Sequence, residues 1–386
     1  MPDSDRKDQV IDLCRRLVRI PTATGEEGEA IHFLESEMSR LGYRTFIDDT
    51  GNLLGVIEGG KPGPRILLDS HVDTVPVSDE SAWRVDPFGG DVVGGRLYGR
   101  GSSDMKGALA ASIVAGESFA GGRDGFAGEV WISVTVAEEI YEGVAAREVE
   151  RRVAPDLVVV GESTDLKLNR GGRGRAEVAM VARGRSAHSS NPSAGDNAVY
   201  KMVEAISAVR ELELSRHPQL GRAIAELTDI KSRPYPGASV VPDFCRATYD
   251  RRLLPGEERD EVLRQFADAV SGVDGVGVEF VTAEATMWTG RRVSAERFFP
   301  AWLYPKDHPD LDAIRRALES RELYRGTGTY SFCTNAAHWA GVAGIPTFGY
   351  GPSKETLAHV DDEYIEVEEL YEAYLGYEAI LEGLLS

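Results

Sequence analysis

The sequence contains few cysteines and lacks a long hydrophobic run. Its three cysteines, Cys14, Cys245 and Cys333, lie far apart, form no Cys-X-X-Cys spacing and are odd in number. This pattern argues against a secreted, disulfide-stabilised framework. No apolar stretch is long enough to cross a bilayer, and the polar start at residues 1–7 does not resemble a signal peptide. We therefore expect a cytoplasmic protein that has no membrane partner.

Positive charge is also scarce. Lys and Arg total 43 against 63 Asp and Glu, which gives a formal net charge of -20. Such a charge repels phosphate backbones and anionic lipid surfaces, so nucleic acid is not an expected partner. The length of 386 residues exceeds that of one typical domain. We therefore expect two domains around large cores.

Apolar spacing in the first part of the chain predicts helices interleaved with strands. A helix is predicted at 6–20, and Thr24 with Glu27 resembles a capping box that opens a second helix. A third helix is predicted at 105–119. Buried strands are predicted at 52–58, 65–69, 129–137 and 156–160. This order predicts a layered α/β domain around a central, mostly parallel sheet, with ligands outside the carboxyl ends of its strands.

An Arg/Gly-rich run at 170–175 marks a break in composition, after which a separate pattern begins. Strands and helices alternate there, as is typical of a small α+β sandwich, at 176–182, 197–212, 244–251, 257–270 and 276–281. Residues 298–309 are predicted to form a loop, and helices at 311–321 and 366–385 return to the first domain. We therefore predict a first domain made of residues 1–170 and 291–386, with a smaller domain, 171–290, inserted into it.

Several predicted elements are followed by imidazole or carboxylate side chains. Taken singly, each has an ordinary explanation as a surface pair, a helix cap or a structural histidine. Together they predict one site, since the ends of parallel strands meet at one edge of a sheet. Imidazoles and carboxylates without a thiolate suit zinc, and also manganese or cobalt. The candidates are His71, Asp73, Asp104, Glu138, Glu139, Glu162 and His359.

Three features of these candidates suggest different roles for them. Asp104 is the best candidate to bridge two cations, because a carboxylate has two oxygens. Adjacent side chains at a strand end point in opposite directions, so Glu138 and Glu139 need not act alike. Asp73 is placed to orient His71, or lies near the group that does.

With these residues identified, the chain resembles metallopeptidase family M20. This family contains acetylornithine deacetylase, succinyl-diaminopimelate desuccinylase, aminoacylase and glutamate carboxypeptidase. The resemblance runs nearly from end to end of the chain. Its motifs lie at 71–76, 83–88, 99–107, 137–139, 161–162 and 186–188, the last before Asn191 and Pro192.

The resemblance implies a dinuclear zinc site and assigns a role to each residue. One zinc would be held by His71, Asp104 and Glu162, and the other by Asp104, Glu139 and His359. Glu138 matches the general base that acts on a metal-activated water, and Asp73 matches the residue that orients His71. The inserted domain resembles a lid that also forms a homodimer interface. There, His188 matches a histidine that reaches the reacting carbonyl, in some members across that interface, and Arg252 matches an arginine that pairs with the substrate carboxylate.

We therefore expect a metal-dependent hydrolase that cleaves the amide bond of an N-acyl amino acid or a related small amide. Deacylases similar to this chain tend to carry Glu where Glu162 stands, whereas carboxypeptidases and dipeptidases tend to carry Asp. The alternatives are a zinc exopeptidase or dipeptidase acting on a short peptide, a dinuclear phosphoesterase, and a non-catalytic binding protein on the same fold. Ser239, Cys333 and Asn335 depart from the common family pattern, which fits a less characterised branch.

Overall fold

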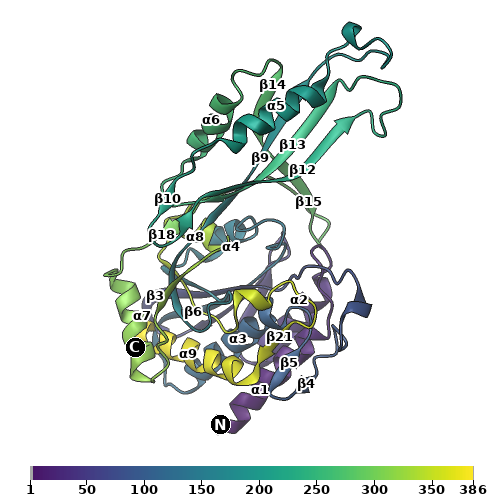
Figure 1. The fold of residues 1–386 in the computed structure, drawn as a ribbon. Helices are drawn as coiled ribbons and strands as arrows, with labels where there is room; N and C mark the ends of the chain where they lie inside the picture. The colour runs from purple at the N-terminus through teal and green to yellow at the C-terminus, as the bar shows by residue number, and fades with distance from the viewer. Residues whose placement is uncertain (1–2, 386) are drawn as a thin grey trace.

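A nine-stranded sheet forms the core of one of the two units into which the chain folds (Figure 1). The computed structural model describes residues 3–385. The strand order is β1-β2-β6-β3-β7-β20-β8-β18, with β19 also on β8. Its central strands β6, β3, β7 and β20 are parallel, which confirms the predicted α/β class. The strands are β1 Arg44–Ile47, β2 Leu53–Glu58, β3 Gly60–His71, β6 Phe126–Thr135, β7 Leu157–Val160, β8 Leu168–Gly172, β18 Trp302–Leu303, β19 Thr327–Tyr330 and β20 Thr347–Gly349.

Helices cover both faces of this sheet, because alternate side chains of its strands enter two different cores. Ile66 and Leu68 of β3 pack with residues of α1, α2, α3, α7 and α9, whereas Leu67 packs on the other face with α4 and α8. A strand buried on both faces gives the continuous apolar run seen in the sequence. The helices are α1 Asp3–Val18, α2 Gly28–Arg40, α3 Gly107–Gly121, α4 Ala146–Val153, α7 Pro309–Ser320, α8 Ala336–Trp339 and α9 Val367–Leu385.

The predicted capping box is wrong. The residue that precedes α2 is Glu27, and its side chain makes no capping bond to the helix. Instead, the Glu27 carboxylate accepts hydrogen bonds from the main-chain nitrogens of Gly25 and Ala137. The Thr24 hydroxyl donates to the buried Asp73 carboxylate at 2.8 Å. Both side chains therefore serve tertiary contacts, which outweigh the local preference for a cap.

The second unit is a five-stranded sheet with the order β12-β13-β9-β14 and with β17 on β9. Helices α5 and α6 cover one face of it, in agreement with the predicted strand and helix order. The strand β12 was not predicted, since it is a largely exposed edge strand without clear apolar alternation. The predicted loop 298–309 contains β17 and β18. The elements are β9 Gly174–Arg183, α5 Ala198–Arg210, β12 Ile224–Arg233, β13 Phe244–Leu253, α6 Arg259–Ala269, β14 Val276–Phe280 and β17 Phe298–Phe299.

Shorter strands complete the fold. A three-stranded sheet has the order β21-β5-β4, and two hairpins are formed by β10 with β11 and by β15 with β16. Within the described residues, no helix is long and apolar enough to span a membrane. These strands are β4 Val92–Val93, β5 Arg96–Tyr98, β10 Arg216–His217, β11 Gly221–Arg222, β15 Thr282–Thr286, β16 Arg292–Glu296 and β21 Tyr364–Glu366.

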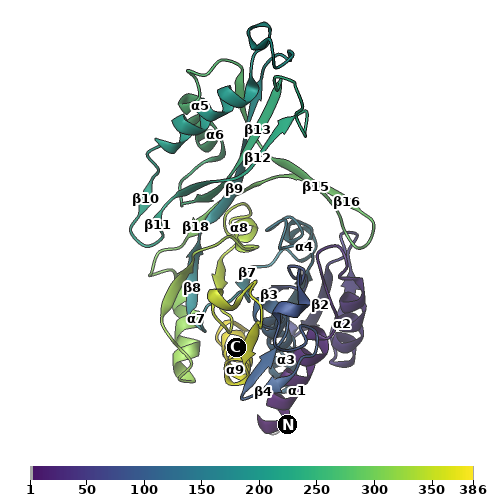
Figure 2. The ribbon, with the colours of Figure 1, turned by 45° about the vertical axis from the view of Figure 1, so that its right-hand side comes forward.

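The β15–β16 hairpin reaches from the second unit back to the first (Figure 2). At its tip, the indole nitrogen of Trp288 donates to the main-chain oxygen of Gly51 at 3.1 Å, and Thr289 donates to that of Asp49. A Cβ on Gly51 would lie 2.2 Å from the Trp288 indole. Glycine at this position therefore leaves the space that the indole occupies, and the hairpin ties the two units together.

Replacing Gly51 tests this contact. Gly51 and the exposed Gly42 have φ of 104° and 90°, so alanine at either position costs about 1 kcal/mol of backbone strain. Nothing lies near a Cβ built on Gly42. We expect Gly51→Ala to lower the free energy of unfolding in urea by at least about 1 kcal/mol more than Gly42→Ala. The excess should disappear in a Trp288→Ala background, and equal losses for the two alanines would contradict the contact.

Candidate metal centre

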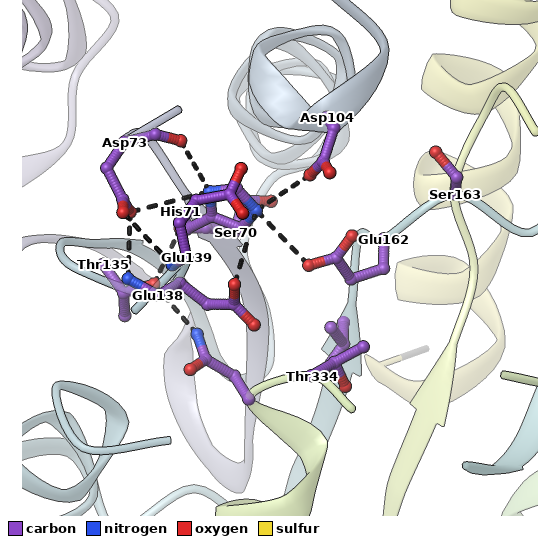
Figure 3. Close-up of polar contacts among 12 residues, drawn as sticks. Ser70, His71, Asp73, Asp104, Thr135, Glu138, Glu139, Glu162, Ser163 and Thr334 are labelled. Atoms are coloured by element: carbon purple, nitrogen blue, oxygen red, sulfur yellow. Dashed lines mark hydrogen bonds and ion pairs between the residues drawn. The ribbon is translucent and has the colours of Figure 1, made fainter. Parts of the chain in front are cut away.

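Three parallel strands place most of the candidate side chains at one edge of the nine-stranded sheet (Figure 3). His71 is the last residue of β3, Glu138 and Glu139 follow β6, and Glu162 follows β7. Ala137 has a left-handed φ of 57°, an uncommon backbone conformation for a residue other than glycine. This turn redirects the chain directly before Glu138. The parallel pairing is thus the reason that residues distant in sequence meet.

Asp104 lies between the two imidazoles. Its Oδ1 is 3.0 Å from His71 Nε2, and its Oδ2 is 3.2 Å from His359 Nε2. Asp104 precedes α3 in an irregular turn and does not act as the N-cap of that helix. The two oxygens of one carboxylate therefore face two separate nitrogen donors.

Each imidazole also lies close to a second carboxylate, which the other imidazole does not share. His71 Nε2 lies 3.3 Å from Glu162 Oε1, and His359 Nε2 lies 2.9 Å from Glu139 Oε2. Glu138 Oε2 is farther away, 4.0 Å from His71 Nε2. The other oxygen of Glu138, Oε1, is buried and has no hydrogen-bond partner within residues 3–385.

The acidity of these groups is strongly perturbed. Burial, together with the neighbouring carboxylates, raises the pKa of Glu138 well above its usual range. Burial and the charge of Asp104 raise the pKa of Glu139 and of Glu162 to about 7. Hydrogen bonds to Asp104 and Glu139 raise the pKa of His359 to about 10. The site therefore holds an excess of negative charge that protons offset.

A divalent cation fits this donor set. Two groups offer ligand atoms within 4.8 Å of one another, His71 with Glu138 and Glu162, and His71 with Asp104 and Glu139. Metal binding would displace the protons that these carboxylates and imidazoles now share. Imidazole with carboxylate is a common donor set of catalytic zinc sites.

Asp73 contacts the site through two parts of the residue. His71 Nδ1 donates to the main-chain oxygen of Asp73 at 2.9 Å, while the Asp73 carboxylate lies farther away, at 3.6 Å. That carboxylate accepts hydrogen bonds from the main-chain nitrogens of Glu138 at 3.0 Å and Glu139 at 3.2 Å. It thereby holds the turn that carries both glutamates.

Glu363 supports Asp104 in a similar way. It was not predicted from the sequence as a site residue. Its buried carboxylate accepts from the main-chain nitrogens of Ser103 at 2.9 Å and Asp104 at 3.1 Å, and pairs with Arg100 at 2.7 Å. The sequence offers little signal for this role. Glu363 directly follows two aspartates, where an acidic run is usually a solvated face.

A cavity of about 380 Å³ is lined by metal-ligand candidates and also by Arg252. Its wall also includes Glu142 and Arg175, which were not among the predicted site residues. His188 is not part of this wall. It is exposed in the second unit, where its Nδ1 accepts from the main-chain nitrogen of Ser190 at 3.1 Å. The structure thus gathers the predicted metal ligands, Asp73, Glu138 and Arg252, but not His188.

Comparison with known proteins gives consistent matches. The model of peptidase family M20/M25/M40 matches residues 67–383. The uncharacterised protein YgeY of Escherichia coli strain K12 is 32% identical over 373 residues, 92% of this chain and 90% of that protein. Succinyl-diaminopimelate desuccinylase of Parvibaculum lavamentivorans is 30% identical over 297 residues, 71% of this chain and 73% of that enzyme.

Solved structures share this fold. The crystal structure of an M20 family metallo-carboxypeptidase from Sulfolobus solfataricus matches with a TM-score of 0.77 at 16% identity, covering 98% of this chain and 99% of that one. This likeness concerns the fold, whereas the family match rests on the sequence along most of the chain. The chain therefore belongs to peptidase family M20/M25/M40, whose members are metal-dependent hydrolases of amide bonds.

Proposed function

We propose that the protein is a dinuclear zinc amidohydrolase. The observation that carries this proposal is the placement of Asp104, whose two oxygens face His71 and His359. In this assignment His71, Asp104 and Glu162 hold one ion, and Asp104, Glu139 and His359 hold the other. Cobalt or manganese would also suit these ligands. The two ions would supply a Lewis acid for the substrate carbonyl and would lower the pKa of water.

Glu138 is the proposed general base. Its carboxylate lies at the cavity wall, and its Oε1 has no partner among the described residues. Glu138 would take the proton of the attacking water and deliver it to the leaving amine. Burial and adjacent carboxylates raise the pKa of Glu138, and a higher pKa strengthens a carboxylate as a base toward the water proton. Asp73 fixes the main chain of Glu138 and so positions this base.

The proposed substrate is an N-acyl amino acid or a related small amide. Arg252 supports this class because it lines the cavity and its terminal nitrogens make no hydrogen bond within residues 3–385. A guanidinium grips a carboxylate with two parallel hydrogen bonds. A sequence relative named succinyl-diaminopimelate desuccinylase removes an acyl group from such a compound. The three buried, unpaired cysteines support a cytoplasmic location.

We further propose a homodimer in which His188 completes the site of the partner protomer. β12 is an edge strand, and apolar side chains are exposed along it and along α5. Pairing of this edge with a second copy would cover them and satisfy the open backbone groups. His188 lies in the same unit and would stabilise the oxyanion of the partner's substrate. The exposed apolar residues are Tyr200, Val203, Ile224 and Ile230.

Glu138→Gln tests the proposed base. The amide cannot accept the water proton, so we expect kcat for an N-acyl amino acid to fall about 10²- to 10⁴-fold while zinc content stays unchanged. The matched control is Glu129→Gln, a glutamate at the opposite end of β6, which should keep full activity. Undiminished turnover of Glu138→Gln would contradict the role, and loss of zinc would make Glu138 a ligand.

The same assays separate the alternative functions. A panel of N-acyl amino acids, dipeptides and a generic phosphate ester distinguishes a deacylase from a dipeptidase and a phosphoesterase. Chelator-sensitive hydrolysis of acyl amino acids is the expected result. Zinc-loaded protein that hydrolyses none of these compounds would favour a non-catalytic binding protein on this fold.

Mixed dimers test the role of His188. Glu138→Gln and His188→Ala should each be defective alone. After subunit exchange, half of the dimers are mixed, and each holds one intact site, so activity should return to roughly a quarter of the wild-type value. Mixing without any gain would show that His188 does not act across an interface. Sedimentation of each variant supplies the control for dimer formation.

A further inference from the structure

Glu142 is a buried carboxylate of the cavity wall that the proposed mechanism does not use. It lies four residues after Glu138 and is only 6% exposed. Its Oε1 accepts a hydrogen bond from Arg175 Nη1 at 2.9 Å. Its Oε2 is buried and has no partner within residues 3–385. Of the carboxylates that line the cavity, Glu138 and Glu142 each have such an unpaired oxygen.

Arg175 holds Glu142 in place and has little capacity left for a ligand. Its Nε donates to Asp250 Oδ2 at 2.8 Å, and its Nη2 donates to Glu177 Oε1 at 3.0 Å. Each nitrogen of this guanidinium therefore already meets a carboxylate. The fork geometry of arginine fixes the direction of each of these bonds. Arg175 thus acts as a rigid support for the Glu142 side chain.

The same network orients Arg252. Asp250 Oδ1 lies 3.0 Å from Arg252 Nε, while Asp250 Oδ2 accepts from Arg175. β13 carries Asp250 and Arg252, and β9 carries Arg175. The cavity wall therefore presents two ligand-binding groups linked through Asp250. One is the donor guanidinium of Arg252, and the other is the acceptor oxygen of Glu142.

The charges of this network balance before any substrate binds. It contains three carboxylates and three guanidiniums, joined by ion pairs of 2.8 to 3.0 Å. A substrate whose carboxylate pairs with Arg252 brings one further negative charge into the cavity. A positive group on the same substrate, placed beside Glu142, would offset it. The members of the network are Glu142, Glu177, Asp250, Arg175, Arg252 and Arg297.

We propose that Glu142 is a specificity-determining residue that accepts a hydrogen bond from a protonated amine of the substrate. The preferred substrates are then amides of amino acids that carry a second, cationic amino group in addition to the carboxylate taken by Arg252. This inference rests on the proposed amidohydrolase function and adds the chemistry of the side chain that the cavity selects. A buried carboxylate oxygen without a partner gains its strongest hydrogen bond from such a donor, because both groups are then charged.

Two matched pairs of compounds test this selectivity. They are the Nα-acetyl derivatives of L-lysine and L-norleucine, and those of L-ornithine and L-norvaline, in which the second member lacks the amine. We expect wild-type kcat/KM to be at least roughly tenfold higher for the cationic member of a pair. Glu142→Gln keeps an oxygen for Arg175 and places a donor where Oε2 was. In this variant the ratio of kcat/KM for the cationic compound to kcat/KM for the uncharged one should fall to about one. The values for the uncharged compounds should change little.

Glu177→Gln is the control, because it removes another carboxylate partner of Arg175 without being part of the cavity wall. It should keep the preference for the cationic compounds. Equal kcat/KM values within both wild-type pairs, or an unchanged preference in Glu142→Gln, would overturn the inference.

Failure of the proposed function gives a different result. If zinc-loaded wild type hydrolyses none of the four compounds, that function is wrong, and calorimetric binding then decides the role of Glu142. Tighter binding of L-lysine than of L-norleucine to the wild type, lost in Glu142→Gln, would support the role. Equal binding of the two amino acids would refute it.

Discussion

Repulsion between carboxylates that share one end of the central sheet is the constraint on which the site depends. Asp104, Glu138, Glu139 and Glu162 meet there with only two imidazoles among the metal-ligand candidates. Burial raises the pKa of the three glutamates, since charged groups in a poorly solvated site need counter-charge. Divalent cations between the carboxylates would let them ionise together. The rest of the fold holds these groups in place against their mutual repulsion.

The supporting groups are themselves buried and charged, so the site is built in layers. Asp73 fixes the turn of Glu138 and Glu139, and Glu363 fixes the loop of Asp104. Beyond them, Arg175 joins a carboxylate after β6 to the sheet of the second unit. The cavity wall thus combines metal-ligand candidates of the first unit with Arg175 and Arg252 of the second. Their relative position is fixed by ion pairs as well as by the β15–β16 hairpin.

The sequence predicted those features that depend on local pattern. Continuous apolar runs identified β3, β6 and β7, and parallel pairing then followed from the interleaved helices. His71, Glu138, Glu139 and Glu162 could be found because they directly follow these strands. The exposed edge strand β12 has no such pattern, and the hairpin that carries Trp288 is held by contacts with residues more than 200 positions away. Neither feature leaves a periodic signal.

Long-range polar contacts account for the remaining differences. Thr24 has the spacing of a helix cap, yet its hydroxyl donates to Asp73 because a buried carboxylate there needs donors. Glu142 and Glu363 look like solvated acids in the sequence, and only tertiary contacts reveal their buried partners. The predicted contribution of His188 concerns a second copy of the chain. Such contacts depend on where segments meet in space, which spacing along the chain does not encode.

Anomalous diffraction from crystals of the zinc-loaded protein would show directly whether Asp104 bridges two ions. We expect two zinc peaks on either side of Asp104, one contacting His71 and Glu162 and the other contacting His359 and Glu139. A single peak, or zinc bound without contact to Asp104, would contradict it.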